Sequence, residues 1–225
     1  MWPCSSWVDP DSKYHDREKP EVAAPGTNIN STTTSSPWIR ATGSGTSYSA
    51  PMATGVAALL MNRNISLQSS PEAIKAILMA TALHNIEGSS RLSEYDGAGG
   101  IVADEADNVA RGIYGGWGYR SYTCSTINPL TVASPYLTAG TRTRVVIAWP
   151  TDPSYGSYTT RPSSDLGLYI DNSLGYTIAV SDWWDNTYEI VDFVPSQSGY
   201  YKIQVYKFRC DLSPSRLAWA WYHRN

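Results

Sequence analysis

The chain has 225 residues, in which 17 Lys and Arg are set against 20 Asp and Glu, so the formal net charge is -3 and the isoelectric point is near 5.6. This balance excludes a general nucleic-acid binder, which would carry a basic surplus. With 42% hydrophobic and 16% charged residues, the composition is that of a globular protein. No stretch approaches the roughly 18 consecutive apolar residues of a membrane helix. The first residues have neither the basic n-region nor the apolar core of a signal peptide. We expect neither nucleic acid nor a membrane as a partner.

The first part of the chain predicts loops followed by one long helix. Residues 1–40 are polar and interrupted by prolines, which indicates loops around at most one short strand, at residues 22–24. Glycines then lead into an apolar run that continues to residue 61. Because this run is apolar on nearly every side, we expect a helix that is fully buried against a sheet.

Two further helices are expected downstream. Ser70 is followed by Pro71 and Glu72, which is the pattern of an N-cap, a proline at the first helical position and an acid in the first turn. Apolar residues at helical spacing then predict a helix that runs to about Leu83. A short helix is expected over residues 101–110.

The second half of the chain shows the two-residue hydrophobic period of β-strands. Strands are expected at residues 143–149, 166–170, 187–194 and 200–205. We therefore divide the chain into an α/β region over residues 1–111, a linker over 112–117 and an antiparallel β-sandwich or jelly roll over 118–225. The sandwich should fold alone, whereas the first region should not. Arg142 and Arg144 alternate along one strand and are expected on an exposed face.

The sequence that opens the first helix carries the strongest chemical signal. Nucleophilic catalysis needs a hydroxyl on a sharp turn and backbone amides that stabilise an oxyanion, and the first turn of a helix supplies both. Gly43 and Gly45 would let a substrate backbone approach Ser47 closely. From the residues alone, the alternative is an ordinary serine that opens a core helix.

Three segments resemble motifs of the subtilisin-like serine peptidases, the subtilases. Residues 45–55 read GTSYSAPMATG and resemble the serine motif of that family. Residues 19–26 read KPEVAAPG and resemble the segment that precedes the serine motif. Residues 95–103 read YDGAGGIVA and resemble the stretch that closes the catalytic domain. The likeness covers residues 5 to about 111.

This resemblance implies a fold, a reaction and a set of site residues. The fold would be the C-terminal part of a three-layer α/β catalytic domain. Ser47 would be the nucleophile of a serine endopeptidase that cleaves protein or peptide substrates through an acyl-enzyme. Gly43, Ser44, Gly45 and Thr46 would lie beside the bound substrate. The resemblance also implies an extracellular location.

The sequence departs from the family in the residues that should activate the serine. Subtilases order their triad as Asp, His and Ser, with an oxyanion Asn before the Ser, and none of the upstream motifs is present. His15, His84 and His223 match no catalytic His segment. Because a serine without a base is a poor nucleophile, we expect the chain to be an inactive C-terminal portion of a longer peptidase. The alternative is a non-catalytic binding or accessory protein that keeps a remnant serine motif and uses its β-sandwich to hold a partner or a polysaccharide.

The β-region also resembles domains that follow bacterial subtilase domains. The similar segments are residues 164–169, 185–189 and 195–201. In those relatives loop acids can bind calcium, so Ca²⁺ is the one cofactor that the resemblance suggests. The candidate ligands are Asp165, Asp171, Asp182 and Asp185. Gly167 stands where the pattern has Asp, and solvated turn acids are the alternative.

Two pairs of residues in the second half of the chain suggest further roles. Trp183 and Trp184 could stack on a sugar or a peptide, or they could close one end of the sandwich. Cys124 and Cys210 lie in the strand-rich half, and the resemblance to a secreted family leads us to expect them to lie close enough for a disulfide, with Cys4 unpaired. Cysteine spacing gives no zinc site.

Overall fold

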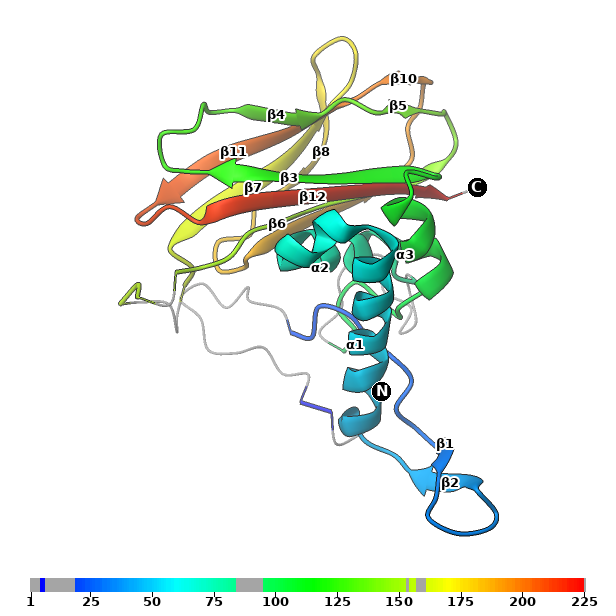
Figure 1. Cartoon of the computed structure of the whole chain (residues 1–225). Helices are drawn as coiled ribbons and strands as arrows, with labels where there is room; N and C mark the ends of the chain where they lie inside the picture. The colour runs from blue at the N-terminus through cyan, green and yellow to red at the C-terminus, as the bar shows by residue number, and fades with distance from the viewer. Residues whose placement is uncertain (1–4, 7–18, 84–94, 153, 157–160, 225) are drawn as a thin grey trace.

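The computed structural model describes residues 5–6, 19–83, 95–152, 154–156 and 161–224 of the chain. The helices lie on one side of two stacked sheets (Figure 1). The N-terminal region contains β1 (Ile29–Thr32), β2 (Ile39–Gly43), α1 (Thr46–Arg63), the 3-10 helix η1 (Ile65–Ser69), α2 (Pro71–Thr81) and α3 (Ala103–Ala110). The predicted mixed α/β region is thus confirmed. No helix among the described residues is long and apolar enough to cross a membrane.

Helix α2 begins as the sequence predicts. Ser70 is the N-cap residue, and its Oγ accepts a hydrogen bond from the N–H of Ala73 at 3.4 Å. Pro71 is the first helical residue, where its missing N–H costs no intrahelical hydrogen bond. The helix ends at Thr81, slightly before the expected Leu83.

The segment before α1 contains a hairpin that the sequence pattern does not predict. Strands β1 and β2 pair antiparallel, and none of their residues is buried, so the hairpin has no apolar alternation that could reveal it. The strand expected at residues 22–24 is reduced to one parallel bridge between Ala23 and Gly100.

The second half of the chain is made of antiparallel strands. They are β3 (Gly115–Tyr122), β4 (Leu130–Ala133), β5 (Tyr136–Leu137), β6 (Arg142–Ala148), β7 (Ser164–Asp171), β8 (Thr177–Ser181), β9 (Tyr188–Phe193), β10 (Gly199–Tyr200), β11 (Lys202–Cys210) and β12 (Ser215–Arg224). Two four-stranded sheets have the orders β3-β12-β6-β9 and β4-β11-β7-β8. The predicted antiparallel β-rich domain is confirmed. Strand β3 includes residues 115–117 of the expected linker, and the domain boundary itself stays a prediction.

The sheet β3-β12-β6-β9 is buried on both faces. On β6, Val145 and Ile147 belong to the core between the two sheets, whereas Val146 and Ala148 belong to a second core that includes Ile77 of α2. Helices and strands therefore share this second core. Residues 118–225 alone would expose it to water, so the packing argues against the expectation that the sandwich folds independently.

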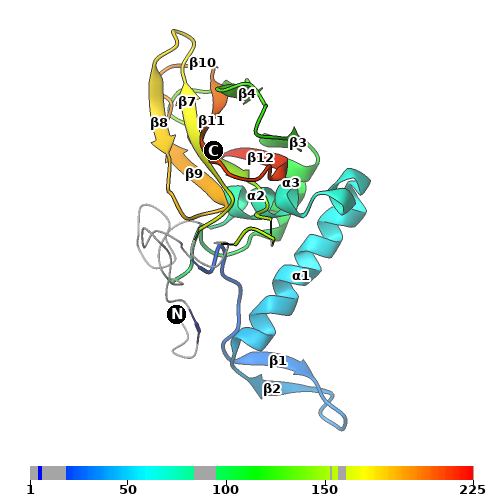
Figure 2. The same cartoon turned by 90° about the vertical axis from the view of Figure 1, so that its left-hand side faces the viewer.

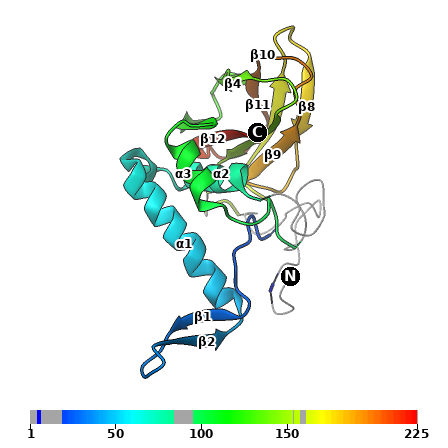
Figure 3. The ribbon, with the colours of Figure 1, turned by 90° about the vertical axis from the view of Figure 1, so that its right-hand side faces the viewer.

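Helix α1 projects away from the sheets, and the hairpin β1–β2 lies at its far end (Figures 2 and 3). Leu60, near the end next to the sheets, is the one buried residue of this fully described helix. The expectation of a helix buried on all sides is therefore wrong for this structure. The helix is as apolar as the sequence shows, but none of the described sheets covers its apolar residues.

Arg144 corrects the expectation of an exposed arginine pair on β6. Its side chain is buried, with 5% exposed, and its Nη1 donates to the carbonyl oxygens of Met79, Ala82 and Ala98 at 3.1, 3.1 and 2.9 Å. Two of these carbonyls belong to the C-terminal end of α2, which covers this face of the sheet. Arg142, by contrast, is 43% exposed as expected.

A disulfide joins the two sheets. Cys124 follows β3 and Cys210 ends β11, and their Cα atoms lie 5.5 Å apart. The expected proximity of this pair is confirmed. Cys4 lies outside the described residues.

Candidate active site

Ser47 lies in the first turn of α1 with an exposed side chain, which confirms its predicted position at a helix start. The N-cap residue is Gly45, which has no side chain to cap the helix, and the first turn contains no acid. The first amides of a helix have no intrahelical acceptor and carry the positive end of the helix dipole. This end of α1 can therefore stabilise a negative oxygen next to Ser47.

The loop before Ser47 is fixed by hydrogen bonds to residues 26 and 28. The N–H of Gly45 donates to the carbonyl oxygen of Gly26 at 2.7 Å, and Ser44 Oγ accepts from the N–H of Asn28 at 2.8 Å. Gly43, at the end of β2, has a φ of +139°, a conformation that glycine adopts without strain. The candidate substrate-binding residues thus form one ordered turn beside Ser47.

Gly26 explains why a glycine ends the segment KPEVAAPG. A Cβ at this position would lie 2.2 Å from Ser49 Oγ and 2.8 Å from the carbonyl oxygen of Gly45. Only glycine allows this backbone to pass so close to the first turn of α1.

The segment at residues 95–103 packs against the same region. The N–H of Ala23 donates to the carbonyl oxygen of Gly99 at 2.9 Å, and the N–H of Ile101 donates to that of Ala23 at 2.8 Å. Gly97 has a φ of +61°, and a Cβ there would lie 2.1 Å from the carbonyl oxygen of Pro20. Three segments that are distant in the sequence therefore meet beside the start of α1.

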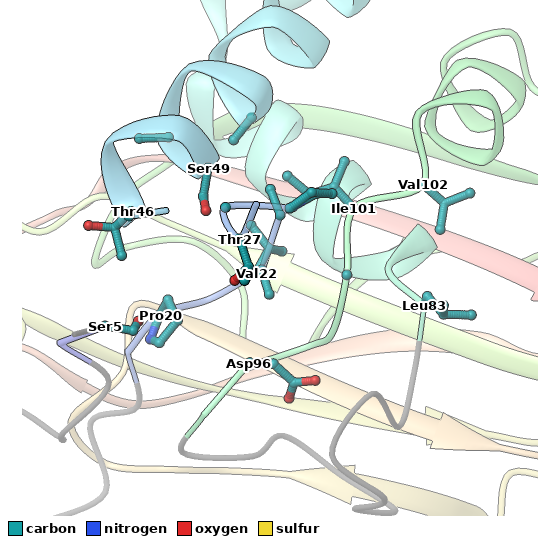
Figure 4. A pocket seen from close by; sticks show the side chains of 18 residues that line it. Ser5, Pro20, Val22, Thr27, Thr46, Ser49, Leu83, Asp96, Ile101 and Val102 are labelled. Carbon is teal, nitrogen blue, oxygen red and sulfur yellow. The ribbon is translucent and has the colours of Figure 1, made fainter. Parts of the chain in front are cut away.

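A largely apolar cavity of about 640 Å³ lies among these segments (Figure 4). Thr46 and Ser49 line it from α1, and Val22 and Ile101 line it from the two adjoining segments. Ser47 is not among its lining residues. The cavity therefore lies on a different side of the first helical turn from the Ser47 hydroxyl.

Two lysines share the carboxylate of Glu21 and tie residues 19–26 to the rest of the protein. Burial alone would raise the pKa of Glu21, but Lys75 and Lys19 outweigh it and lower the pKa to about 2. Lys75 Nζ lies 2.7 Å from Glu21 Oε1 and 4.6 Å from the ring centre of Tyr188 on β9. Burial lowers the pKa of Lys75 to about 8, against the attraction of Glu21. The sequence pattern does not predict this cluster, because its members are distant in the chain.

His223, the one histidine among the described residues, does not lie near Ser47. His223 is on β12, which ends beside the C terminus, whereas the N-terminal end of α1 lies far from that strand (Figures 1 and 2). Burial lowers the pKa of His223. His15 and His84 lie outside the described residues. Within the described part of the chain, no imidazole is therefore placed to activate Ser47.

The candidate calcium ligands are engaged in separate contacts. Asp165 lies 3.8 Å from Arg209, Asp182 accepts from the Tyr169 hydroxyl at 3.1 Å, and Asp171 accepts from Thr177 Oγ1 at 2.7 Å. Asp185 is buried in the β8–β9 loop. Among the described residues, no group of three or more His, Cys, Asp or Glu side chains is arranged to hold a metal ion. The calcium hypothesis therefore gains no support from the side-chain geometry.

Strand β9 carries a buried acid, Glu189, beside the β8–β9 loop, and the sequence did not predict its burial. Glu189 accepts hydrogen bonds from the Ser181 hydroxyl and, at 3.0 Å, from the N–H of Trp183. Burial raises its pKa well above the usual range. Trp184 is 49% exposed, whereas Trp183 is half-buried. The loop is thus folded around Glu189, and a ligand role for the tryptophan pair stays a prediction.

Comparison with known proteins identifies the N-terminal region. Residues 5–115 match the sequence model of the subtilase family, and no curated protein matches the chain. A periplasmic inhibitor of g-type lysozyme, PliG of Aeromonas hydrophila, is 16% identical over 51% of this chain and 90% of its own, with a TM-score of 0.34. The SPBc2 prophage-derived protein YomS is 12% identical over 48% of this chain and 95% of its own, with a TM-score of 0.28. These structural likenesses are too weak to carry a functional argument. Residues 5–115 of this chain belong to the subtilase family, and a β-rich region follows them.

Proposed function

We propose that this chain supplies the nucleophile, Ser47, of a serine endopeptidase that cleaves protein or peptide substrates. The observation that carries the proposal is the exposed hydroxyl of Ser47 at a helix N-terminus without a capping side chain. Ser47 Oγ attacks the scissile carbonyl carbon, and the oxyanion that forms accepts a hydrogen bond from the Ser47 N–H. Collapse of this intermediate expels the amine and leaves an acyl-enzyme, which water hydrolyses.

The turn at residues 43–46 binds the substrate backbone beside Ser47. Gly43 and Thr46 are exposed, so a peptide can reach the turn. The hydrogen bonds of Ser44 and Gly45 to the preceding segment hold the turn in place before substrate arrives. Such preorganisation lowers the cost of reaching the transition state.

The proton of Ser47 is taken by a histidine from polypeptide beyond this sequence, because none of the three histidines of the chain stands in a catalytic motif. The exposed face of α1 supports this part of the proposal. This face is apolar, and it is formed by exposed residues that recur at helical spacing: Pro51, Met52, Gly55, Ala58 and Leu59. Leu59 is 68% exposed. The remainder of the catalytic domain packs on this face.

Gly55 adds a second argument for a missing neighbour. A Cβ at this position would meet no atom within 4 Å, so nothing in the described structure requires a glycine there. Glycine inside a helix nevertheless costs about 1 kcal/mol relative to alanine. Close approach of another backbone to α1 accounts for it.

We also propose that the enzyme works outside the cell. The disulfide between Cys124 and Cys210 supports this location, because structural disulfides persist in oxidising compartments and are rare in the cytosol.

The proposal is tested by completing the catalytic domain. The Asp- and His-bearing part of a subtilase catalytic domain is fused in front of residue 1, and hydrolysis of fluorogenic casein is measured. We expect cleavage by the fusion, a loss of roughly a millionfold in Ser47→Ala, and retained activity in the control Ser49→Ala, whose hydroxyl lines the neighbouring cavity. A folded fusion that leaves casein intact would favour the accessory-protein alternative and overturn the proposal.

A further inference from the structure

The turn beside Ser47 is held by residues 21–28, which we call the support segment. The N–H of Gly45, two residues before Ser47, donates to the carbonyl oxygen of Gly26 at 2.7 Å. At the other end of the support segment, the carbonyl oxygen of Glu21 accepts from the N–H of Ala98 at 2.9 Å. Residues 43–46 of the turn are themselves exposed or half-buried, so no core fixes them. The position of the turn therefore depends on what holds the support segment.

Lys75 on α2 ties the support segment to the helices. Its Nζ lies 2.7 Å from Glu21 Oε1, and about a quarter of each side chain is exposed. Lys19 also contacts this carboxylate, but it stands only two residues before Glu21 and connects it to no other element. The neighbours of Lys75 on α2, Ile74 and Ala76, are buried, so the helix gives the lysine a fixed base.

Two residues of the β-rich region hold Lys75 beside Glu21. The lysine Nζ donates to Thr187 Oγ1 at 3.5 Å and lies 4.6 Å from the ring centre of Tyr188. Tyr188 begins β9, is 1% exposed and pairs with Ala148 of β6. A cation over an aromatic ring is attracted by the electrons of the ring face. The lysine therefore joins β9 to the support segment.

The same sheet reaches the support segment by a second route. Arg144 of β6 donates to the carbonyl oxygen of Ala98 at 2.9 Å, and the N–H of Ala98 donates to Glu21. Strands β6 and β9 are neighbours in the sheet β3-β12-β6-β9. Both routes start from the β-rich region and meet at Glu21, one at its carboxylate and the other at its carbonyl oxygen.

We propose that Lys75, held by β9, positions the turn that carries Ser47. The β-rich region is then a part of the catalytic support and not a separate module. The effect on catalysis rests on the proposed peptidase function, whereas the positioning itself is measurable without any reaction. Loss of the ammonium group lets the support segment and Gly45 open more often. Displacing a reacting group by about 1 Å costs on the order of a hundredfold in rate.

The first test is amide hydrogen exchange in the full 225-residue chain, followed by NMR. Lys75→Met keeps a long side chain and removes the charge. We expect the amides of Ala23 and Gly45 to exchange roughly five- to tenfold faster, which corresponds to the loss of one ion pair and one cation–ring contact. The amide of Leu168, on a strand paired on both sides in the other sheet, should be unchanged. Lys75→Arg keeps the cation and should restore slow exchange, and the control Lys202→Met, which removes an exposed lysine of β11, should match the parent.

The second test separates the contribution of β9 and the effect on catalysis. Tyr188→Leu removes the ring that faces Lys75 and should speed the exchange of Gly45, whereas Tyr188→Phe keeps the aromatic face and should not. In the fusion with the Asp- and His-bearing part of a catalytic domain, Lys75→Met should lower casein hydrolysis by roughly tenfold or more, and Lys75→Arg should restore it.

Each contrary result has a distinct meaning. Equal exchange of Gly45 in Lys75→Met and the parent would overturn the proposal. Equal acceleration of Gly45 and Leu168 would also overturn it, because Lys75 would then stabilise the whole fold and not the turn. Unchanged casein hydrolysis by Lys75→Met in an active fusion would overturn the role of Lys75 in the intact enzyme. A folded but inactive parent fusion, together with faster exchange of Gly45 in Lys75→Met, would overturn the peptidase function alone and support the positioning of the turn.

Discussion

Replacement of Arg144 by alanine should be among the most destabilising single changes in this protein. Its guanidinium donates to three buried carbonyl oxygens, of Met79, Ala82 and Ala98, and lies 3.1 Å from Asp192. Alanine would leave these carbonyls without that donor and remove one cation beside a carboxylate that is 11% exposed. Breaking a buried ion pair of this kind costs about 3–5 kcal/mol. That is a large part of the roughly 5–15 kcal/mol that stabilises a typical domain.

The matched control is Arg142→Ala, because Arg142 bonds the same carboxylate of Asp192 from a side chain that is 43% exposed. An exposed pair contributes about 1 kcal/mol or less. Urea unfolding at pH 7, followed by tryptophan fluorescence, gives the free energy of unfolding of each variant. If Arg144→Ala costs no more than Arg142→Ala, the guanidinium does not join α2 to the sheet.

Three further perturbations should change the stability of the fold. Replacing Cys124 and Cys210 by alanine should lower the unfolding free energy by about 4–5 kcal/mol, since the bridge closes a loop with a sequence separation of 86, and thermal melting measures this. Because the pKa of Glu21 is lowered from 4.5 to about 2, its ionised carboxylate stabilises the fold at pH values above 4.5. Up to about 3 kcal/mol of the unfolding free energy is lost as the pH falls towards about 2. Glu21→Gln should flatten that part of the pH profile. Gly26→Ala should destabilise the chain, because its Cβ would lie 2.8 Å from the backbone carbonyl oxygen of Gly45, whereas Gly55→Ala, in open space, should stabilise it by about 1 kcal/mol in urea unfolding.

Local sequence chemistry predicted much of this fold. The N-cap at Ser70 and Pro71 located α2, and the glycine turn before Ser47 located the start of α1. Strands β6, β7 and β9 carry apolar residues at strand spacing and were predicted within a few residues. These features depend on neighbours in the sequence, which is why a single chain reveals them.

Features that depend on distant partners could not be predicted in the same way. Arg144 alternates with Arg142 along its strand, as residues on an exposed face do. Its side chain is nevertheless covered by α2, which comes from a distant part of the chain. The apolar composition of α1 indicates burial, yet burial also needs a covering element. Glu189 lies on β9 opposite Ile147, on the face between the two sheets, so its burial depends on the packing of strands that are distant in the chain. In the candidate site, Ser47 and its turn were predictable, whereas the Glu21–Lys75 contact required the tertiary structure.

The most direct measurement of the role of Ser47 is the position of a covalent fluorophosphonate adduct, mapped by mass spectrometry after proteolytic digestion. A fluorophosphonate reacts with a serine only when a base activates it. We predict no adduct on the 225-residue chain alone and a stoichiometric adduct on Ser47 once the Asp- and His-bearing part of the catalytic domain is fused to it. A folded fusion that carries no adduct, or carries it on Ser44 or Ser49 instead, would contradict the assignment of Ser47 as the nucleophile.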